Sequence, residues 1–173
     1  MNDLLQAKNN QKDKLIESIL KLESFLPDNS YRLKVKLNQI FTNKIDGTCL
    51  YVLKTKNLNE ENLRIKYREL KNKETFKLSS INEIKEFDGT IYVGSSNSLK
   101  SRINQHLGNS SEKVYSLHLK NWFGEIDNQI DLEYYVIPKE YSGLANILEN
   151  GLWDLKKPLF GKKGTNVKSS INL

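Results

Sequence analysis

Apolar residues recur at intervals of three and four in four segments of the chain, as they do along one face of an α-helix. The sequence therefore predicts helices over residues 3–24, 57–72, 99–107 and 142–156. Asn57 or Asn59 can cap the second of these helices, and Ser98 and Gly108 can begin and end the third. The apolar side of the last helix comprises Leu144, Ile147, Leu148, Leu152 and Leu155.

Three other segments have the composition of buried strands. Apolar runs follow the turn signals Asp46-Gly47 and Asp88-Gly89, and a third run ends at Pro138. The sequence predicts strands over residues 48–53, 90–93 and 131–137. Residues 113–123 mix apolar and basic side chains and favour neither helix nor strand.

This order of elements predicts an α/β (α+β) fold, a compact domain in which helices flank a small central sheet, mixed or antiparallel. We expect a helical extension over residues 1–45 and the main domain over residues 46–173. Residues 54–88, which contain a basic helix, form an insertion between the first two strands in this scheme.

The composition narrows the class of protein. Of the 173 residues, 38% are hydrophobic, which is enough for a packed core. The chain has 27 basic and 21 acidic residues and a formal charge of +6, which favours a nucleic-acid partner, although many basic proteins bind no polyanion. Its single cysteine, Cys49, excludes an internal disulfide and a cysteine-based metal cluster. Because we find neither a signal peptide nor an apolar segment of membrane-spanning length, we expect a cytoplasmic protein.

Candidate chemistry begins where the strand over residues 90–93 meets the following helix. Tyr92-Val93-Gly94 and a short polar loop lead into a helix that carries Arg102 and His106 one turn apart. Arginine can hold a phosphate through two parallel hydrogen bonds, and histidine titrates near neutral pH. Taken alone, this Arg-x-x-x-His spacing is more typical of a surface helix with a solvated histidine.

The whole string, however, resembles the second half of the GIY-YIG nuclease motif, with Val93 in place of isoleucine. Cys49-Leu50-Tyr51 resembles the first half, with Cys49 where the family prefers glycine. The two tyrosines, Tyr51 and Tyr92, are 41 residues apart. In this long spacing the chain resembles restriction-type members that carry an insertion between the tyrosine strands.

The end of the chain extends this resemblance, which covers about residues 47–167. Glu149 lies on the last predicted helix, and Lys157-Pro158 follow it, as the family pattern requires. Asn166 lies close to a position where the family often carries asparagine.

The resemblance implies a metal-dependent endonuclease that hydrolyses phosphodiester bonds. Glu149 would bind Mg²⁺ or Mn²⁺, because a carboxylate is a hard oxygen ligand. Arg102 would stabilise the charge on the phosphate. Tyr51 would activate the attacking water with the help of His106, and Tyr92 would position water or phosphate. His118 is more typical of a structural or supporting residue than of a ligand.

DNA is the expected substrate, in restriction, repair or mobile-element activity, with RNA and a homodimer left open. The candidate nucleic-acid contacts are Arg64, Arg68, Lys100, Lys162, Lys163 and Asn166. Two other classes remain as alternatives: a nucleic-acid-binding module that has lost the chemistry, and a toxin or effector with a protein partner.

Overall fold

The computed structural model describes residues 30–164. The chain divides into two compact units, residues 1–30 and residues 31–173, and the description below concerns the second together with Ser30. The helix expected over residues 3–24 and the candidate contact Asn166 lie outside the described residues. Within residues 30–164, no helix has the length and apolar character needed to cross a membrane.

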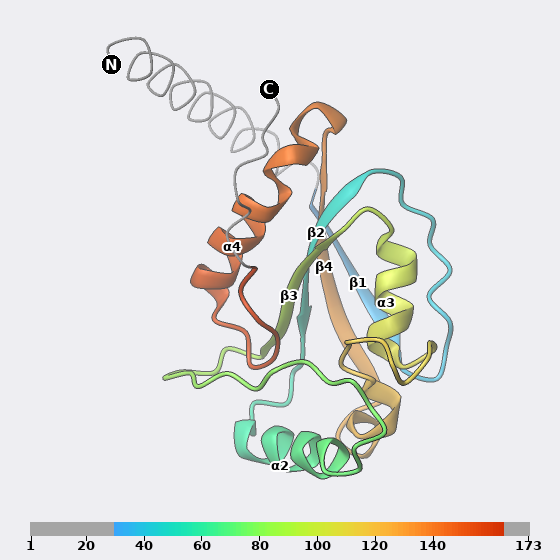
Figure 1. Ribbon diagram of the computed structural model, residues 1–173, viewed down its shortest axis with the longest axis vertical. Coiled ribbons are helices and arrows are strands. Elements are labelled where there is room, and N and C mark those ends of the chain that lie inside the picture. Colours follow the sequence, from blue (N-terminus) through green and yellow to red (C-terminus); the bar gives the residue numbers. More distant parts are fainter. Residues whose placement is uncertain (1–29, 165–173) are drawn as a thin grey trace. The chain divides into compact units, whose positions relative to one another are not determined.

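A four-stranded sheet forms the centre of the domain (Figure 1). Its strands, in the order β1-β4-β2-β3, are β1 (Ser30–Lys36), β4 (Gln129–Ile137), β2 (Thr48–Lys54) and β3 (Thr90–Ser96). β2 pairs antiparallel with β3 on one side and with β4 on the other. This interior position explains why β2 is a nearly continuous apolar run, since both of its faces are covered.

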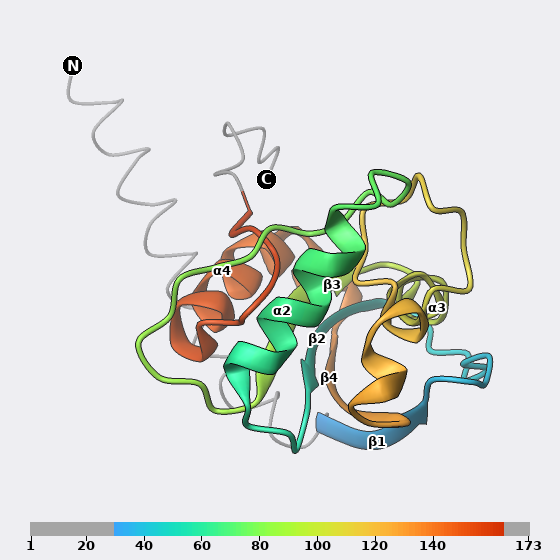
Figure 2. The same cartoon turned by 90° about the horizontal axis from the view of Figure 1, so that it is seen from below.

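Three α-helices pack around the sheet. They are α2 (Glu60–Lys71), α3 (Leu99–Leu107) and α4 (Ala145–Lys156), and a 3₁₀ helix (Lys139–Leu144) leads into α4. α3 and α4 lie on opposite sides of the sheet, and α2 crosses near one end of the strands (Figures 1 and 2). Two short 3₁₀ turns, Leu119–Asn121 and Phe123–Glu125, precede β4.

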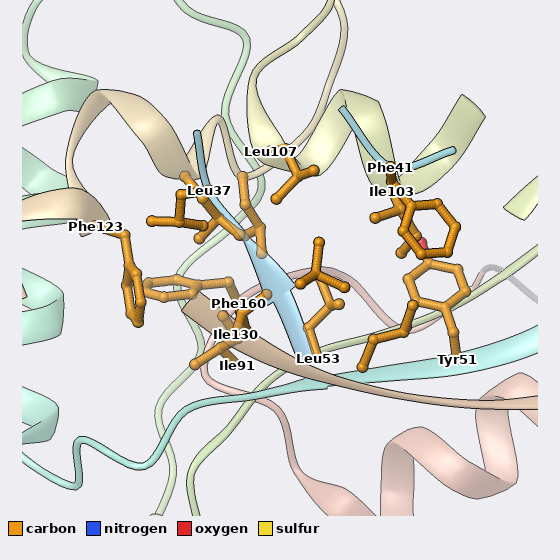
Figure 3. Close-up of a cluster of buried hydrophobic side chains, with 14 of the residues drawn as sticks. Leu37, Phe41, Tyr51, Leu53, Ile91, Ile103, Leu107, Phe123, Ile130 and Phe160 are labelled. Atoms are coloured by element: carbon orange, nitrogen blue, oxygen red, sulfur yellow. The ribbon is translucent and has the colours of Figure 1, made fainter. Parts of the chain in front are cut away.

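The main core lies between the sheet and the helices α2 and α3. Figure 3 shows side chains from β2, β3 and β4 packed against Ile103 and Leu107 of α3. Leu63, Tyr67 and Leu70 of α2 belong to the same cluster, and the ring of Tyr67 lies 4.1 Å from that of Phe160. The segment 54–88, which the sequence predicted to be an insertion, therefore contributes α2 to the core of the domain.

The predicted elements of the main domain are present with small shifts in their ends. Asn59 caps α2 through a hydrogen bond from the backbone of Asn62. α3 spans the predicted residues, and Gly108 ends it with φ +91°, a left-handed conformation that favours glycine. Residues 113–123, where the sequence favoured no element, form a loop that leads into the 3₁₀ turns.

One strand was not predicted. Residues 30–36, which the sequence analysis assigned to the N-terminal extension, form β1 beside β4. Tyr31, Leu33 and Val35 alternate there with basic residues, which is the period of a strand with one covered face. Tyr31 stacks on Tyr134 of β4 at a centroid distance of 4.9 Å.

Candidate active site

The two tyrosines of the predicted motif lie on neighbouring strands and on the same face of the sheet. Tyr51 is opposite Gly94 in the β2–β3 pairing, and Leu53 is opposite Tyr92. Because side chains alternate along a strand, Tyr51 and Tyr92 both point toward α3. Their rings are stacked, with centroids 6.1 Å apart.

Gly94 leaves the space that the Tyr51 hydroxyl occupies. A Cβ atom at position 94 would lie 2.6 Å from Tyr51 Oη and 2.8 Å from the ring carbon that bears it. Any larger residue would displace this hydroxyl. The glycine of the Tyr-Val-Gly element is therefore explained by close packing.

The guanidinium of Arg102 joins the two tyrosine hydroxyls. Arg102 Nε donates to Tyr51 Oη at 3.3 Å, and Nη2 donates to Tyr92 Oη at 3.1 Å. Nη1 donates to Gln105 Oε1 at 2.8 Å and to the carbonyl oxygen of Tyr115 at 3.0 Å. All three nitrogens of the guanidinium are thus held in place before any substrate binds.

His106 completes the network from inside the core. The side chain is fully buried, and its Nε2 lies 3.0 Å from Tyr51 Oη. Its Nδ1 accepts a hydrogen bond from the backbone N–H of Leu117 at 3.3 Å, so the ring proton of the neutral imidazole must be on Nε2. His106 therefore donates to Tyr51, and the expectation of a solvated histidine is excluded.

The protonation states follow from burial. Burial, and then the charges of Arg102 and His118, lower the pKa of His106 well below its ordinary value, which keeps the ring neutral. Burial is also the largest cause that raises the pKa of Tyr51, and the positive charge and hydrogen bond of Arg102 act against it. Tyr51 Oη thus accepts two N–H donors, an arrangement that would stabilise a phenolate.

Glu149 approaches from α4. Its Oε2 accepts a hydrogen bond from Ser95 Oγ at 2.5 Å, and Ser95 directly follows Gly94 in β3. Burial raises the pKa of the Glu149 carboxyl, against the Ser95 hydrogen bond and the charge of Arg102. The charge of Glu149 in turn contributes to the raised pKa of Tyr51, so these groups lie within electrostatic reach of one another.

The donor set fits a hard divalent cation held by one protein carboxylate. Glu149 forms no salt bridge with any of residues 30–164, and burial penalises its negative charge, so a cation would stabilise it. In the same part of the chain, no three His, Cys, Asp or Glu side chains cluster, so Glu149 would be the one protein carboxylate at this site. Magnesium sites are often built from one or two carboxylates together with water and substrate phosphate.

The candidate nucleic-acid contacts divide into exposed and internal residues. Lys100, Lys162, Lys163 and Arg68 are exposed, and Lys163 is paired with Asp154. Arg64, by contrast, is 8% exposed. Its Nε donates to Glu60 at 2.7 Å and its Nη2 to the carbonyl of Asn82 at 2.6 Å. Arg64 therefore joins α2 to the following loop. This internal position corrects the prediction that Arg64 contacts nucleic acid at the surface.

Four residues that the sequence analysis did not assign to the site also contribute to it: Ser95, Gln105, Tyr115 and Leu117. Gln105 could have been predicted as a partner of Arg102, because residues three apart on a helix are neighbours. Tyr115 and Leu117 act through backbone groups, and a side-chain pattern carries no signal for those. His118, buried and bonded to the carbonyl of Val114 at 2.9 Å, lies outside the network of Tyr51 and Arg102.

Comparison with known proteins agrees with this geometry. Residues 83–163 match the family model of the GIY-YIG catalytic domain. No curated protein and no solved structure gives a significant match. Residues 83–163 therefore carry a GIY-YIG catalytic domain, the domain of a family of nucleases. Tyr51 lies before the matched segment, and its pairing with β3 and its hydrogen bonds to Arg102 and His106 bring it into the same site.

Proposed function

We propose that this nuclease hydrolyses phosphodiester bonds of DNA as a metal-dependent endonuclease. The observation that supports the proposal most strongly is the network in which Arg102 and His106 both donate to Tyr51 while Arg102 also donates to Tyr92. A purely structural tyrosine would need no such pair of donors. The formal charge of +6 agrees with a polyanionic substrate.

Arg102 is the residue that would bind the phosphate. Its guanidinium is planar and permanently charged, and it lines a pocket next to the tyrosines. In the reaction, the guanidinium turns from the tyrosine hydroxyls to the phosphate oxygens and stabilises the additional negative charge of the transition state. This movement also uncovers the Tyr51 hydroxyl for the attacking water.

Tyr51 would act as the base in its phenolate form: its own proton first passes to solvent, and Tyr51 Oη then accepts a proton from that water. The water oxygen bonds to phosphorus, the P–O bond to the leaving sugar oxygen breaks, and this oxygen gains a proton from solvent. The Nε2–H of His106 stabilises the Tyr51 phenolate during this step, and Tyr92 positions the water or the phosphate. His106 acts as a fixed hydrogen-bond donor here, because its Nδ1 is already occupied by the Leu117 N–H.

Glu149 would hold Mg²⁺ or Mn²⁺. When bound, the metal would supply Lewis-acid stabilisation of the developing charge. The hydrogen bond from Ser95 holds one oxygen of the Glu149 carboxylate in place.

Purified protein incubated with supercoiled plasmid tests the proposal. We expect nicked and linear DNA with Mg²⁺ or Mn²⁺ and intact plasmid with EDTA. Cutting in EDTA would contradict the metal dependence, and faster cutting of a matched RNA would contradict the choice of DNA. Binding without cutting would favour a module that has lost its chemistry, and failure to bind would favour a protein partner.

A further inference from the structure

A pocket of about 710 Å³ opens beside Arg102. Its lining includes Lys71, Lys77, Tyr92, Arg102, Tyr115 and Lys162. This volume falls in the range of roughly 300–1,000 Å³ that is typical of small-molecule sites. Because Tyr92 and Arg102 belong to both the pocket and the candidate active site, an occupant would lie directly next to a phosphate bound by Arg102.

The charge of the lining favours an anion. Lys71, Lys77 and Lys162 are exposed, and together with Arg102 they outnumber the one carboxylate of the lining, that of Glu74. Cations gathered in a hollow attract phosphate groups more strongly than the same cations spread over a surface. Phosphates on either side of the scissile one are the nearest anions that a bound strand would offer.

The pocket also presents an aromatic face. The Tyr115 side chain is 64% exposed, and Lys77 Nζ lies 5.5 Å from the centroid of its ring. The carbonyl of the same residue accepts the Arg102 hydrogen bond. Contact with the backbone of a duplex needs only cations, whereas an exposed aromatic ring next to cations is typical of sites that stack an unpaired base.

The segment that forms this wall is fixed to the domain. Leu78 and Ser116 form a parallel β-bridge, Lys77 N donates to the carbonyl of Glu112, and Ser116 N donates to the carbonyl of Lys77. Lys77 and Tyr115 are therefore held together. Residues 71–80 precede the segment that matches the family model, and Tyr115 lies within it.

We propose that the pocket binds one nucleotide that is unstacked from the DNA helix and lies next to the scissile phosphate. Its base stacks on Tyr115, and its phosphate is bound by Lys71, Lys77 and Lys162. The enzyme consequently prefers DNA in which this nucleotide is unpaired, because no base pair has to be broken. The inference rests on the proposed nuclease function, since it takes Arg102 to mark the scissile phosphate.

The test compares paired and mismatched DNA. Cuts in plasmid are mapped first, and synthetic duplexes are then made that are either fully paired or carry one mismatch at a position flanking the cut. We expect the parent protein to cut the mismatched duplex faster, by roughly fivefold to a hundredfold. Tyr115→Ala should lose this preference while retaining the carbonyl that holds Arg102. Tyr31→Ala, which removes an exposed tyrosine of β1, is the matched control and should keep it.

Each outcome decides the proposal. Equal preference in the parent and in Tyr115→Ala, or no preference in the parent, would overturn the nucleotide pocket and leave the nuclease function standing. Should neither duplex be cut, binding of both duplexes is measured in EDTA. A mismatch preference in binding that Tyr115→Ala abolishes would then support the pocket without the nuclease function, and no preference would overturn both.

A second variant keeps the test decisive in case Tyr115→Ala does not fold. Lys77→Gln removes the cation above the Tyr115 ring at an exposed position, and it should reduce the mismatch preference in the same direction by a smaller factor. Lys139→Gln, at an exposed position in the 3₁₀ helix before α4, should leave the preference unchanged. Equal effects of the two lysine substitutions would contradict a localised site.

Discussion

On the α3 side of the sheet, Tyr51, Arg102 and His106 are joined by hydrogen bonds within the core, whereas on the α4 side Glu149 is held by Ser95. α3 buries Leu99, Ile103 and Leu107, and none of the residues of α4 is fully buried. The group proposed to bind phosphate is thus part of the folding core, and the group proposed to bind metal is carried by a helix without fully buried residues.

This difference predicts two kinds of mutational effect. Substitutions on the α3 side should change stability and catalysis together, because the same hydrogen bonds serve both. Substitutions on the α4 side should change catalysis with little effect on stability. His106 on one side is a fixed donor, and such donors favour transition-state stabilisation because they need not reorganise. On the other side, a carboxylate on a helix without fully buried residues would be able to adjust to a hydrated cation.

The largest expected effect is that of Glu149→Gln. Loss of the metal ligand should lower the cutting rate at least as much as removal of one preorganised electrostatic group, about a hundredfold to a thousandfold. Thermal unfolding in EDTA should be unchanged or slightly improved, because burial already penalises this charge, as its raised pKa shows. Asp154→Asn, which neutralises the other acidic residue of α4, is the control and should leave the cutting rate unchanged. An active Glu149→Gln protein would exclude the metal-ligand role.

Arg102→Lys should affect both rate and stability. Lysine keeps the charge and loses the planar contact with phosphate, so cutting should slow by about a hundredfold to a thousandfold while DNA binding changes much less. The hydrogen bonds to the two tyrosines, Gln105 and the Tyr115 carbonyl are also lost, at a cost of about 1–3 kcal/mol for partners left buried. Ser101→Ala, an exposed change on the same helix, provides the control. If binding and cutting were lost to the same extent, Arg102 would serve to bind DNA and its role in the transition state would be contradicted.

His106 should give the α3 side a pH-dependent stability. Its pKa in the folded protein is lowered well below 6.5, the value expected in the unfolded chain. As the pH falls below about 6.5, the unfolded state binds a proton that the folded state excludes, and the free energy of unfolding decreases by up to about 1.4 kcal/mol per pH unit. Stability from this group is therefore present above pH 6.5 and is lost as the pH falls toward the folded pKa.

Urea unfolding between about pH 7 and pH 5 measures this dependence. His106→Gln cannot take up the proton, so its stability should fall less steeply over that range even if its absolute stability is lower. Identical slopes for the two proteins would show that His106 is already protonated in the folded state, which would contradict its assignment as a neutral donor to Tyr51.

Local patterns were enough to predict α3 and its bounds. The spacing of Arg102 and His106 places them on one helical face, and Gly108 marks the end of that helix. The same reasoning could not tell that His106 is buried, because its burial depends on the loop that carries Leu117. Backbone donors of this kind are set by tertiary structure.

The errors in the sequence analysis have the same origin. Arg64 is on the basic side of α2, and its burial depends on Asn82, a residue of a later loop. The alternation in β1 was short and interrupted by basic residues, so only its pairing beside β4 distinguishes it from an extended tail. The apolar side of α4 predicted a helix correctly and gave no measure of how far that side is covered.

Two leucines near the ends of α3 and α4 give the most direct test of the contrast, and the leucine of α4 gives the smallest expected effect. Leu107 is 1% exposed, so Leu107→Ala should cost about 2–5 kcal/mol through lost burial and the cavity that remains. Leu155 is 75% exposed, so Leu155→Ala should change the free energy of unfolding by less than about 0.5 kcal/mol. Chemical denaturation measures both. If Leu155→Ala costs as much as Leu107→Ala, the apolar side of α4 is covered in solution, and the carboxylate of Glu149 is then held as firmly as the groups of the α3 side.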